Sequence, residues 1–137
     1  MPTILNPYLS FRDTAKQVME FYQSVFGGEL ASDTFDSGGM GEAYPGEGDK
    51  IMHAQLTTPD GLTLMASDTP NSMEVPPSSS ISISISGEDD AALTTYFDKL
   101  ADGGTVNQPL VEAPWGGKFG MVTDRFGTDW MVAVNPS

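Results

Sequence analysis

Histidine and cysteine, two residue types that often serve reactions or bind transition metals, are almost missing from this chain. The sequence has one histidine, His53, and no cysteine. The missing cysteine removes disulfides, thiolate metal sites and cysteine nucleophiles together. A histidine changes charge near neutral pH and can act as a general base. His53 is therefore a candidate ligand contact or general base, although a lone histidine is more often a hydrogen-bonded structural residue.

The chain is strongly acidic, with 19 acidic and 6 basic residues and a formal net charge of −13. Nucleic-acid affinity depends on Lys and Arg that neutralise phosphates, so we expect no nucleic-acid partner. Acidity of this kind most simply favours solubility, and a cationic ligand is the alternative. No apolar run approaches the roughly 20 residues that span a bilayer, so we expect no membrane partner. We expect a cytoplasmic location, with which the lack of cysteine is compatible.

The first half of the chain predicts a strand, a helix and three further strands. The helix has apolar residues at helical spacing, namely Ala15, Val18, Met19, Tyr22 and Val25. Asp13 or Thr14 is its expected cap, and Gly27-Gly28 its expected end. The strands are expected over residues 3–11, 29–36, 50–58 and 62–68, with a hairpin turn at Pro59-Asp60-Gly61.

The second half repeats this order after a proline-rich join near residue 75. Residues 79–86 alternate Ile and Ser, which predicts a strand with Ile81, Ile83 and Ile85 facing a core. Acidic residues 88–90 favour a helix start, and Gly103-Gly104 its end. The remaining strands are expected over residues 105–112, 117–123 and 129–134.

The repeat predicts an α+β fold of paired βαβββ modules in one domain, residues 1–137. Module one covers about 1–72 and module two about 78–137. Neither half could cover its sheet alone, so we expect the two to form a curved mixed sheet with helices on its outer face. The opposite face would line a cavity, with lining side chains at Asn6, Tyr8, Ser10, Ser80, Ser82 and Ser84.

Local motifs resemble the PhnB-like branch of the vicinal-oxygen-chelate superfamily, which includes glyoxalases, bleomycin-resistance proteins and dioxygenases. The most specific block is Phe-Gly-x-x-x-Asp-x-Phe-Gly-x-x-Trp-Met over residues 119–131. Further similar segments are Asn-Pro-Tyr-Leu-Ser-Phe from residue 6, Ile-Met-His-Ala from residue 51 and Leu-Met-Ala-Ser-Asp from residue 64. The resemblance covers nearly the whole chain.

The resemblance implies a shared cavity, frequent homodimers and, in the enzymes of the superfamily, a divalent metal held by four inward side chains. By strand register these four positions fall near Asn6, Met65, Ser80 and Met131. None of them is His or a carboxylate, and methionine suits soft Cu(I) rather than harder metals. We therefore expect no metal and no other cofactor.

The expected cavity walls are aromatic, and the expected anchors are polar. Tyr8, Trp115 and Phe119 would form the walls with several methionines, because rigid aromatic residues commonly line ligand sites. The polar anchors would be Asn6, His53, Ser82 and Ser84. Trp130 is expected in the core and Asp124 in a structural turn. The Gly-rich stretch 37–49 is expected to be a lid or a dimer contact.

These observations predict a homodimer that binds a small organic molecule without a metal. The alternative is a metal-dependent lyase, isomerase or dioxygenase that assembles its ligands from His53 and carboxylates such as Asp68 or Glu112. Those two carboxylates are also the possible partners of His53 if it is a general base. A third possibility is a module that serves only assembly. The sequence does not identify the ligand or a reaction.

Overall fold

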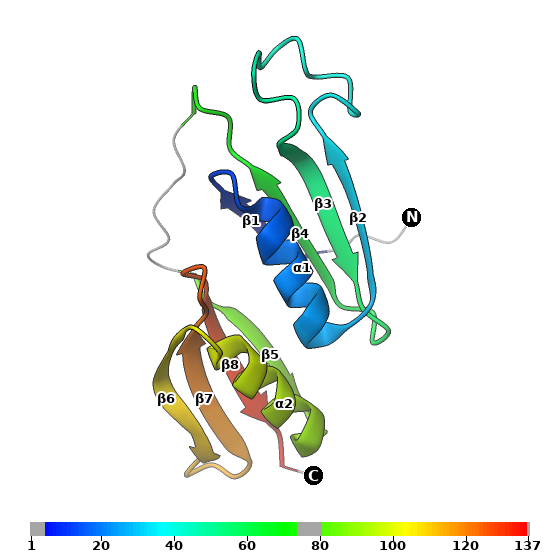
Figure 1. The fold of residues 1–137 in the computed structure, drawn as a ribbon. Helices are drawn as coiled ribbons and strands as arrows, with labels where there is room; N and C mark the ends of the chain where they lie inside the picture. The colour runs from blue at the N-terminus through cyan, green and yellow to red at the C-terminus, as the bar shows by residue number, and fades with distance from the viewer. Residues whose placement is uncertain (1–4, 74–80, 137) are drawn as a thin grey trace. The chain divides into compact units, whose positions relative to one another are not determined.

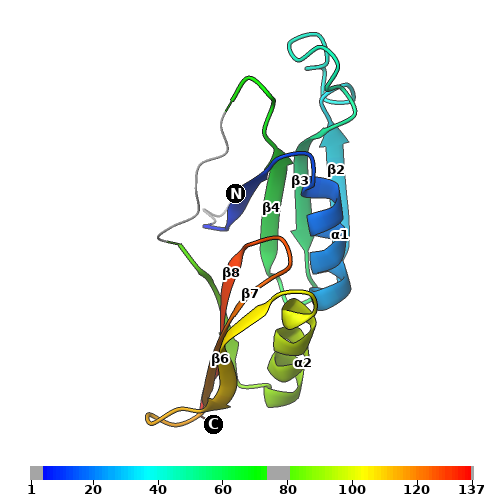
Figure 2. The ribbon, with the colours of Figure 1, turned by 60° about the vertical axis from the view of Figure 1, so that its left-hand side comes forward.

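The computed structural model describes residues 5–73 and 81–136. The chain divides into two compact units, residues 1–77 and 78–137, and each is described by itself. Each unit has one helix packed on a four-stranded mixed sheet, as the α+β repeat predicts (Figure 1). Seen from a second direction, each helix covers one face of its own sheet (Figure 2).

The first unit contains five elements in the predicted order. They are β1 (Tyr8–Phe11), α1 (Ala15–Phe26), β2 (Glu29–Thr34), β3 (Ile51–Thr57) and β4 (Thr63–Asp68). The strands lie in the order β1-β4-β3-β2, with β1 parallel to β4 and the other pairs antiparallel. The predicted apolar stripe of α1 is buried, which confirms the helix and its inward face. Ala54, Leu56, Leu64 and Ala66 of the sheet are buried with it.

Thr14 stands at the N-cap position of α1, as predicted, but its side chain makes no capping hydrogen bond, and the acceptor comes from a distant part of the chain. The carboxylate of Asp68, at the end of β4, accepts a hydrogen bond from the backbone N–H of Ala15 at 2.9 Å. Its other oxygen accepts from the N–H of Ile51 at 2.9 Å. Asp68 is 4% exposed. One buried carboxylate therefore ties the helix start to β3 and β4, and Asp13 turns the chain with a φ of 65°.

The long loop between β2 and β3 closes on itself. Backbone hydrogen bonds join Phe35 to Lys50 and Asp36 to Gly48 at its base. The rings of Phe35 and Tyr44 lie 5.0 Å apart by their centroids. These contacts hold the base of the loop together, and its predicted role as a lid or a dimer contact stays a prediction.

Lys50 joins this loop to two other segments of the first unit. Its Nζ lies 2.7 Å from a carboxylate oxygen of Asp13 and 2.7 Å from Oε1 of Glu47. The same Oε1 accepts the backbone N–H of Asn71 at 2.8 Å. We call Asp13, Glu47, Lys50 and Asn71 the Lys50 cluster.

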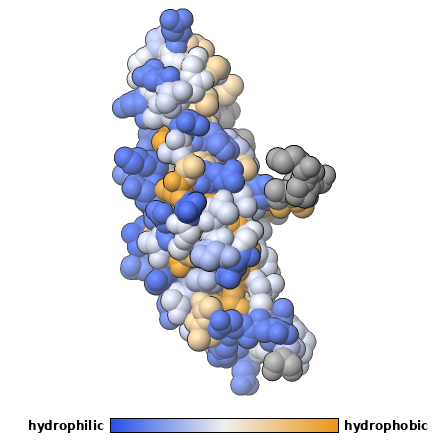
Figure 3. Space-filling view, turned by 90° about the vertical axis from the view of Figure 1, so that its right-hand side faces the viewer, coloured by the Kyte–Doolittle hydropathy of each residue, from blue (hydrophilic) through white to orange (hydrophobic). Residues whose placement is uncertain are grey.

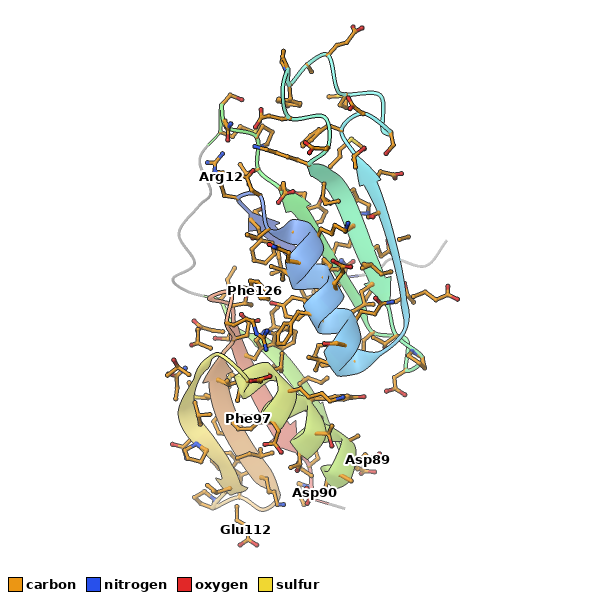
Figure 4. The ribbon with its side chains drawn as sticks, viewed as in Figure 1. Arg12, Asp89, Asp90, Phe97, Glu112 and Phe126 are labelled. Carbon is orange, nitrogen blue, oxygen red and sulfur yellow. The ribbon has the colours of Figure 1, made fainter. Side chains whose placement is uncertain are left out.

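Arg12 makes a separate set of contacts with the segment after β4. Arg12, labelled in Figure 4, donates to the carbonyl oxygens of residues 69, 70 and 73.

The second unit has the same order and topology. Its elements are β5 (Ile83–Gly87), α2 (Asp90–Ala101), β6 (Thr105–Glu112), β7 (Lys118–Thr123) and β8 (Asp129–Val134). The strand order is β5-β8-β7-β6, with β5 parallel to β8. Its core holds Leu93, Phe97, Leu100, Val122, Trp130 and Val132. Trp130 is 2% exposed, which confirms its predicted place in the core.

The start of the second unit differs from the prediction at two positions. The strand begins at Ile83 rather than residue 79, and Ile81 is 75% exposed instead of facing the core. Ile83 and Ile85 face the helix side and are half-buried. Ser80 lies outside the described residues. α2 is capped locally, because Asp89 accepts the N–H of Ala92 at 3.1 Å, so the acidic start predicted this helix correctly.

The turn between β7 and β8 is built on Asp124. One oxygen of its carboxylate accepts the backbone N–H groups of Phe126 and Thr128 at 2.9 and 3.1 Å. The other accepts the indole N–H of Trp130 at 2.9 Å. Gly127 has a φ of 88°, a conformation that glycine adopts without strain. The structural role predicted for Asp124 is confirmed.

Candidate functional site

The candidate sites lie on the sheet faces opposite the helices, which we call the open faces. Side chains alternate along a strand, so residues two apart share a face. In the first unit Ala54 and Leu56 are buried under α1, and His53 and Gln55 therefore point to the open face. Strand register adds further residues to this face: Tyr8, Ser10, Ala31, Asp33, Met65 and Ser67.

Two of the predicted site residues meet on the open face of the first unit. The hydroxyl of Tyr8 lies 3.3 Å from Nδ1 of His53, and the two ring centroids are 5.8 Å apart. Tyr8 pairs with Met65 of β4, the strand that separates β1 from β3. Its ring must therefore extend across β4 to reach His53. Tyr8 is 52% exposed, so a ligand could reach the pair.

The carboxylates that the sequence suggested as partners for His53 are placed differently. Asp68 is buried on the helix side, and both of its oxygens accept backbone N–H groups. It is therefore a structural residue and not a partner of His53. Glu112 belongs to the other unit, at the end of β6 (Figure 4). Sequence reasoning missed Asp33, which is the direct cross-strand partner of His53 on β2.

The open face of the second unit is more apolar. Met131 pairs with Ser84 on one side and with Met121 on the other, and Phe119 pairs with Ala133. Trp115, in the hairpin between β6 and β7, contacts Phe119 edge to face with centroids 6.0 Å apart. Trp115 is 70% exposed and Met121 is 37% exposed. The predicted wall residues Trp115 and Phe119 therefore lie together, and their contact with a ligand stays a prediction.

The remaining predicted anchors lie next to strand ends. Ser82 is exposed and directly precedes β5, while Ser84 is exposed within it. Asn6 is half-buried ahead of β1, and its Nδ2 donates to the carbonyl oxygen of Pro7 at 3.2 Å. All three can offer polar groups at the margin of an open face.

A hydrogen-bonded chain on the second open face was not foreseen. Thr123 donates to Oδ1 of Asp129 at 2.6 Å and accepts from the amide nitrogen of Asn107 at 2.8 Å. The chain links β6, β7 and β8 and places one carboxylate on this face. The signal was present in the sequence, because Asp129 stands two residues before Met131 and shares its face.

Positive charge is kept away from both open faces. Among the described strand positions, none on an open face is Lys or Arg. Lys118 points to the helix side and pairs with Asp90 at 3.0 Å, and Arg125 pairs with Asp102 at 3.2 Å. The open faces carry Asp33 and Asp129 instead, so they suit neutral or cationic groups better than anions.

The residues at the metal positions implied by the resemblance do not fit a divalent metal. Met65 and Met131 lie on the open faces and offer thioether sulfur, which is a poor ligand for such ions. Ser80 lies outside the described residues. Within residues 5–73 and 81–136, no group of three or more His, Cys, Asp or Glu is placed to hold an ion.

A separate hollow of about 320 Å³ lies in the second unit, at the start of α2. Glu88, Asp90 and Glu112 line it together with Lys118, whose charge is paired with Asp90. Figure 4 shows Asp89 and Asp90 at the beginning of α2. Lys118 holds the pKa of the Asp90 carboxyl below its usual value, mainly through their hydrogen bond. None of these residues was among the predicted anchors.

Comparison with known proteins identifies the family. Residues 4–132 match the family described as Glyoxalase/Bleomycin resistance protein/Dioxygenase superfamily. The chain belongs to this superfamily. It is 29% identical to protein YjdN of Escherichia coli strain K12 over 142 aligned residues, which cover 95% of this chain and 94% of that one.

Two solved structures are similar over nearly their whole length. Protein PA1353 from Pseudomonas aeruginosa is 34% identical, with a TM-score of 0.86 and coverage of 99% of this chain and 100% of that one. The PhnB protein from Bacillus cereus is 26% identical, with a TM-score of 0.77 and coverage of 97% and 100%. These findings confirm the predicted superfamily, the PhnB-like branch and the fold.

Proposed function

We propose that this protein is a cytoplasmic, homodimeric binding protein that holds a small neutral or cationic organic molecule on an open face without a metal. The observation that carries the proposal is the composition of the open faces. They combine exposed aromatic and methionine side chains with a few hydrogen-bonding groups, and their described strand positions hold no Lys or Arg. Ligand sites are commonly built in this way, with apolar walls and few polar anchors.

The two open faces would suit different chemical groups. Trp115, Phe119 and Met121 offer apolar contact area, and methionine adapts to varied shapes. Tyr8 and His53 offer hydrogen bonds on the other face. The open face of the second unit would therefore suit an aromatic group, and that of the first unit a polar or amine-bearing group.

Tryptophan fluorescence tests the binding function directly. Trp115 is 70% exposed and Trp130 is 2% exposed, so an added ligand should change the emission of Trp115 selectively. We expect benzylamine and benzyl alcohol to give saturable changes at lower concentration than benzoate. The change should disappear in Trp115→Phe, which keeps an aromatic ring. Tighter binding of benzoate near neutral pH would contradict the charge preference.

Elemental analysis separates the binding function from metal-dependent catalysis. The protein would be analysed as purified and after dialysis against Zn, Mn, Ni and Fe, for the wild type and His53→Ala. We expect no stoichiometric metal in either protein. About one metal per chain, lost in the variant, would instead support a lyase, isomerase or dioxygenase. Sedimentation equilibrium would test the proposed homodimer, and a monomer at high concentration would refute it.

A further inference from the structure

The open face of the second unit, which suits an aromatic group, also carries its own partner for a cation. Asp129 is half-buried at the start of β8, two residues before Met131, which pairs with Met121 of β7. We propose that Asp129 binds the ammonium group of an arylalkylamine whose aromatic ring lies against Met121 and Met131. The inference rests on the proposed function, because it names the class of ligand that this open face would hold.

A hydrogen-bonded chain orients the Asp129 carboxylate without neutralising it. The amide nitrogen of Asn107 donates to the hydroxyl oxygen of Thr123 at 2.8 Å. The hydroxyl must therefore direct its own hydrogen elsewhere, and it donates to Oδ1 of Asp129 at 2.6 Å. Both donors are uncharged, so this chain supplies no positive charge to the carboxylate. Among the described residues no group donates to Oδ2 of Asp129, and this oxygen is available to a ligand.

The other charged strand residues of the second unit lie away from this open face. Within the described strands they are Glu112 and Lys118, which are cross-strand partners on the helix side. Arg125, in the turn that leads to β8, forms an ion pair with Asp102 at the end of α2. A ligand cation beside Asp129 would therefore meet a carboxylate without competition from these cations.

The spacing along β8 sets the length of the ligand. Residues two apart on a strand are separated by about 7 Å, which places Met131 and its partner Met121 at about this distance along the strands from Asp129. Phe119, which pairs with Ala133, lies about 13 Å along the strands. A three-carbon chain between an ammonium nitrogen and a benzene ring matches the shorter distance. Thioether side chains adapt their shape and make favourable contacts with aromatic rings, so the methionine pair suits the ring.

Asp33 on the open face of the first unit provides the comparison. Its neighbours on that face of β2 are Ala31 and Glu29, and its cross-strand partner on β3 is His53. No methionine lies beside it on the open face of these two strands. The variants Asp33→Asn and Asp129→Asn change the net charge by the same amount, which makes the first a matched control for the second.

Nuclear magnetic resonance of the methionine methyl groups tests the inference. The probes are 3-phenylpropylamine, which carries an ammonium group near neutral pH, and 3-phenyl-1-propanol, which has the same length and no charge. We expect both to shift the methyl resonances of Met121 and Met131. The amine should bind about fivefold more tightly than the alcohol, as for a well-placed ion pair near the surface. Asp129→Asn should make the two affinities nearly equal, and Asp33→Asn should preserve their difference.

A second comparison uses the wild-type protein alone and so does not depend on the folding of a variant. Benzylamine and benzyl alcohol have one carbon atom between the polar group and the ring. Benzylamine cannot place its ring against the methionine pair while its nitrogen contacts Asp129. We therefore expect a smaller preference for the amine over the alcohol with this shorter pair of probes. An equal preference at both lengths would overturn the proposed placement of the ring.

The possible outcomes separate this inference from the proposed function. If the amine and the alcohol bind the wild type equally, or if the preference survives Asp129→Asn, the inference is wrong and the binding function stands. If Asp33→Asn removes the preference instead, the cation binds in the first unit and the inference is again wrong. If neither probe shifts any resonance of the wild type up to its limit of solubility, both the inference and the binding function are overturned.

Discussion

Two buried aspartates, Asp68 and Asp124, show how single residues hold this fold. Each uses both carboxylate oxygens to accept hydrogen bonds, Asp68 in the first unit and Asp124 in the second. A buried carboxylate is costly unless it is hydrogen-bonded in this way. In the candidate site, by contrast, Tyr8 and His53 share one hydrogen bond at an exposed position, which leaves hydrogen-bonding capacity for a ligand.

The variant Asp124→Asn tests the turn between β7 and β8. The amide keeps the shape of the carboxylate, but its NH₂ group would face either the Trp130 indole N–H or the backbone N–H groups that now donate. We expect a loss of about 1–3 kcal/mol in the free energy of unfolding, as for a buried donor left without an acceptor. Urea denaturation would measure the loss.

The control for this variant is a double-mutant cycle with Trp130→Phe. If the indole hydrogen bond carries part of the loss, the two substitutions together will cost less than the sum of their separate effects. Strict additivity would show that Trp130 and Asp124 act independently.

Two adjacent glycines at the end of α1 offer a matched comparison. Gly27 and Gly28 both have positive φ, 75° and 101°. A Cβ on Gly28 would collide with the carbonyl oxygen of Thr57, whereas a Cβ on Gly27 would meet open space. We expect Gly27→Ala to cost about 1 kcal/mol from backbone strain alone and Gly28→Ala to cost clearly more. Equal losses in thermal denaturation would contradict the close approach of β3.

At the scale of elements, the Lys50 cluster is a connection whose strength depends on pH. Hydrogen bonds from Lys50 and from the Asn71 backbone hold the pKa of Glu47 below its usual 4.5. Hydrogen bonds to Asp13 and Glu47 raise the pKa of Lys50 above 10.5. The Glu47 carboxylate therefore stabilises the folded protein fully above pH 4.5. This stabilisation is lost as the pH falls through the lowered pKa of Glu47. The Lys50 ammonium group stabilises the folded protein fully below pH 10.5. This stabilisation is lost as the pH rises through the raised pKa of Lys50.

Replacing Lys50 by Met should therefore reduce stability between these two limits and flatten its dependence on pH. Methionine keeps the apolar stem and removes the charge that holds Asp13 and Glu47. Thermal denaturation across the pH range would measure the effect, with Lys16→Met on the exposed side of α1 as the control. A wild-type midpoint that stays constant below pH 4.5 would count against the cluster.

The elements themselves were largely predictable, because their signals are local. The spacing of apolar residues predicted α1 and α2, and glycine pairs predicted where the two helices end. The alternation of side chains along β3 placed His53 and Gln55 on one face. Long-range contacts were not predictable in this way. The cap by Asp68 and the pairing of Tyr8 with His53 join residues 53 and 45 positions apart. The alternation of Ile and Ser includes Ile81, but strand pairing begins only at Ile83. Alternation alone does not show where pairing begins, so the predicted strand started too early.

At the scale of the whole molecule, surface charge is the dominant property. On the face seen in Figure 3, apolar side chains form small separate patches among hydrophilic residues. No helix among the described residues has the length and apolar character to cross a membrane. The net charge of −13 must produce repulsion between carboxylates across the surface.

Added salt should therefore stabilise the protein. At 0.1 M ionic strength, ions screen the repulsion between exposed charges that are more than about 10 Å apart. The attraction within the closely spaced Lys50 cluster should be screened less. We expect the thermal midpoint to rise between low salt and physiological salt. Scanning calorimetry with NaCl and with KCl would measure it, and a falling midpoint would show that attractive ion pairs outweigh the repulsion.

The different caps of the two helices bear on the order in which the chain folds. Asp89 caps α2 from within its own turn, so this helix can start before any strand has paired. The start of α1 depends on Asp68, 53 residues further along the chain and at the end of β4. Closing that loop costs entropy, which only the assembled sheet repays. During synthesis on the ribosome, the earlier helix therefore lacks this cap until its last strand is in place, whereas the later helix has its cap as soon as it emerges.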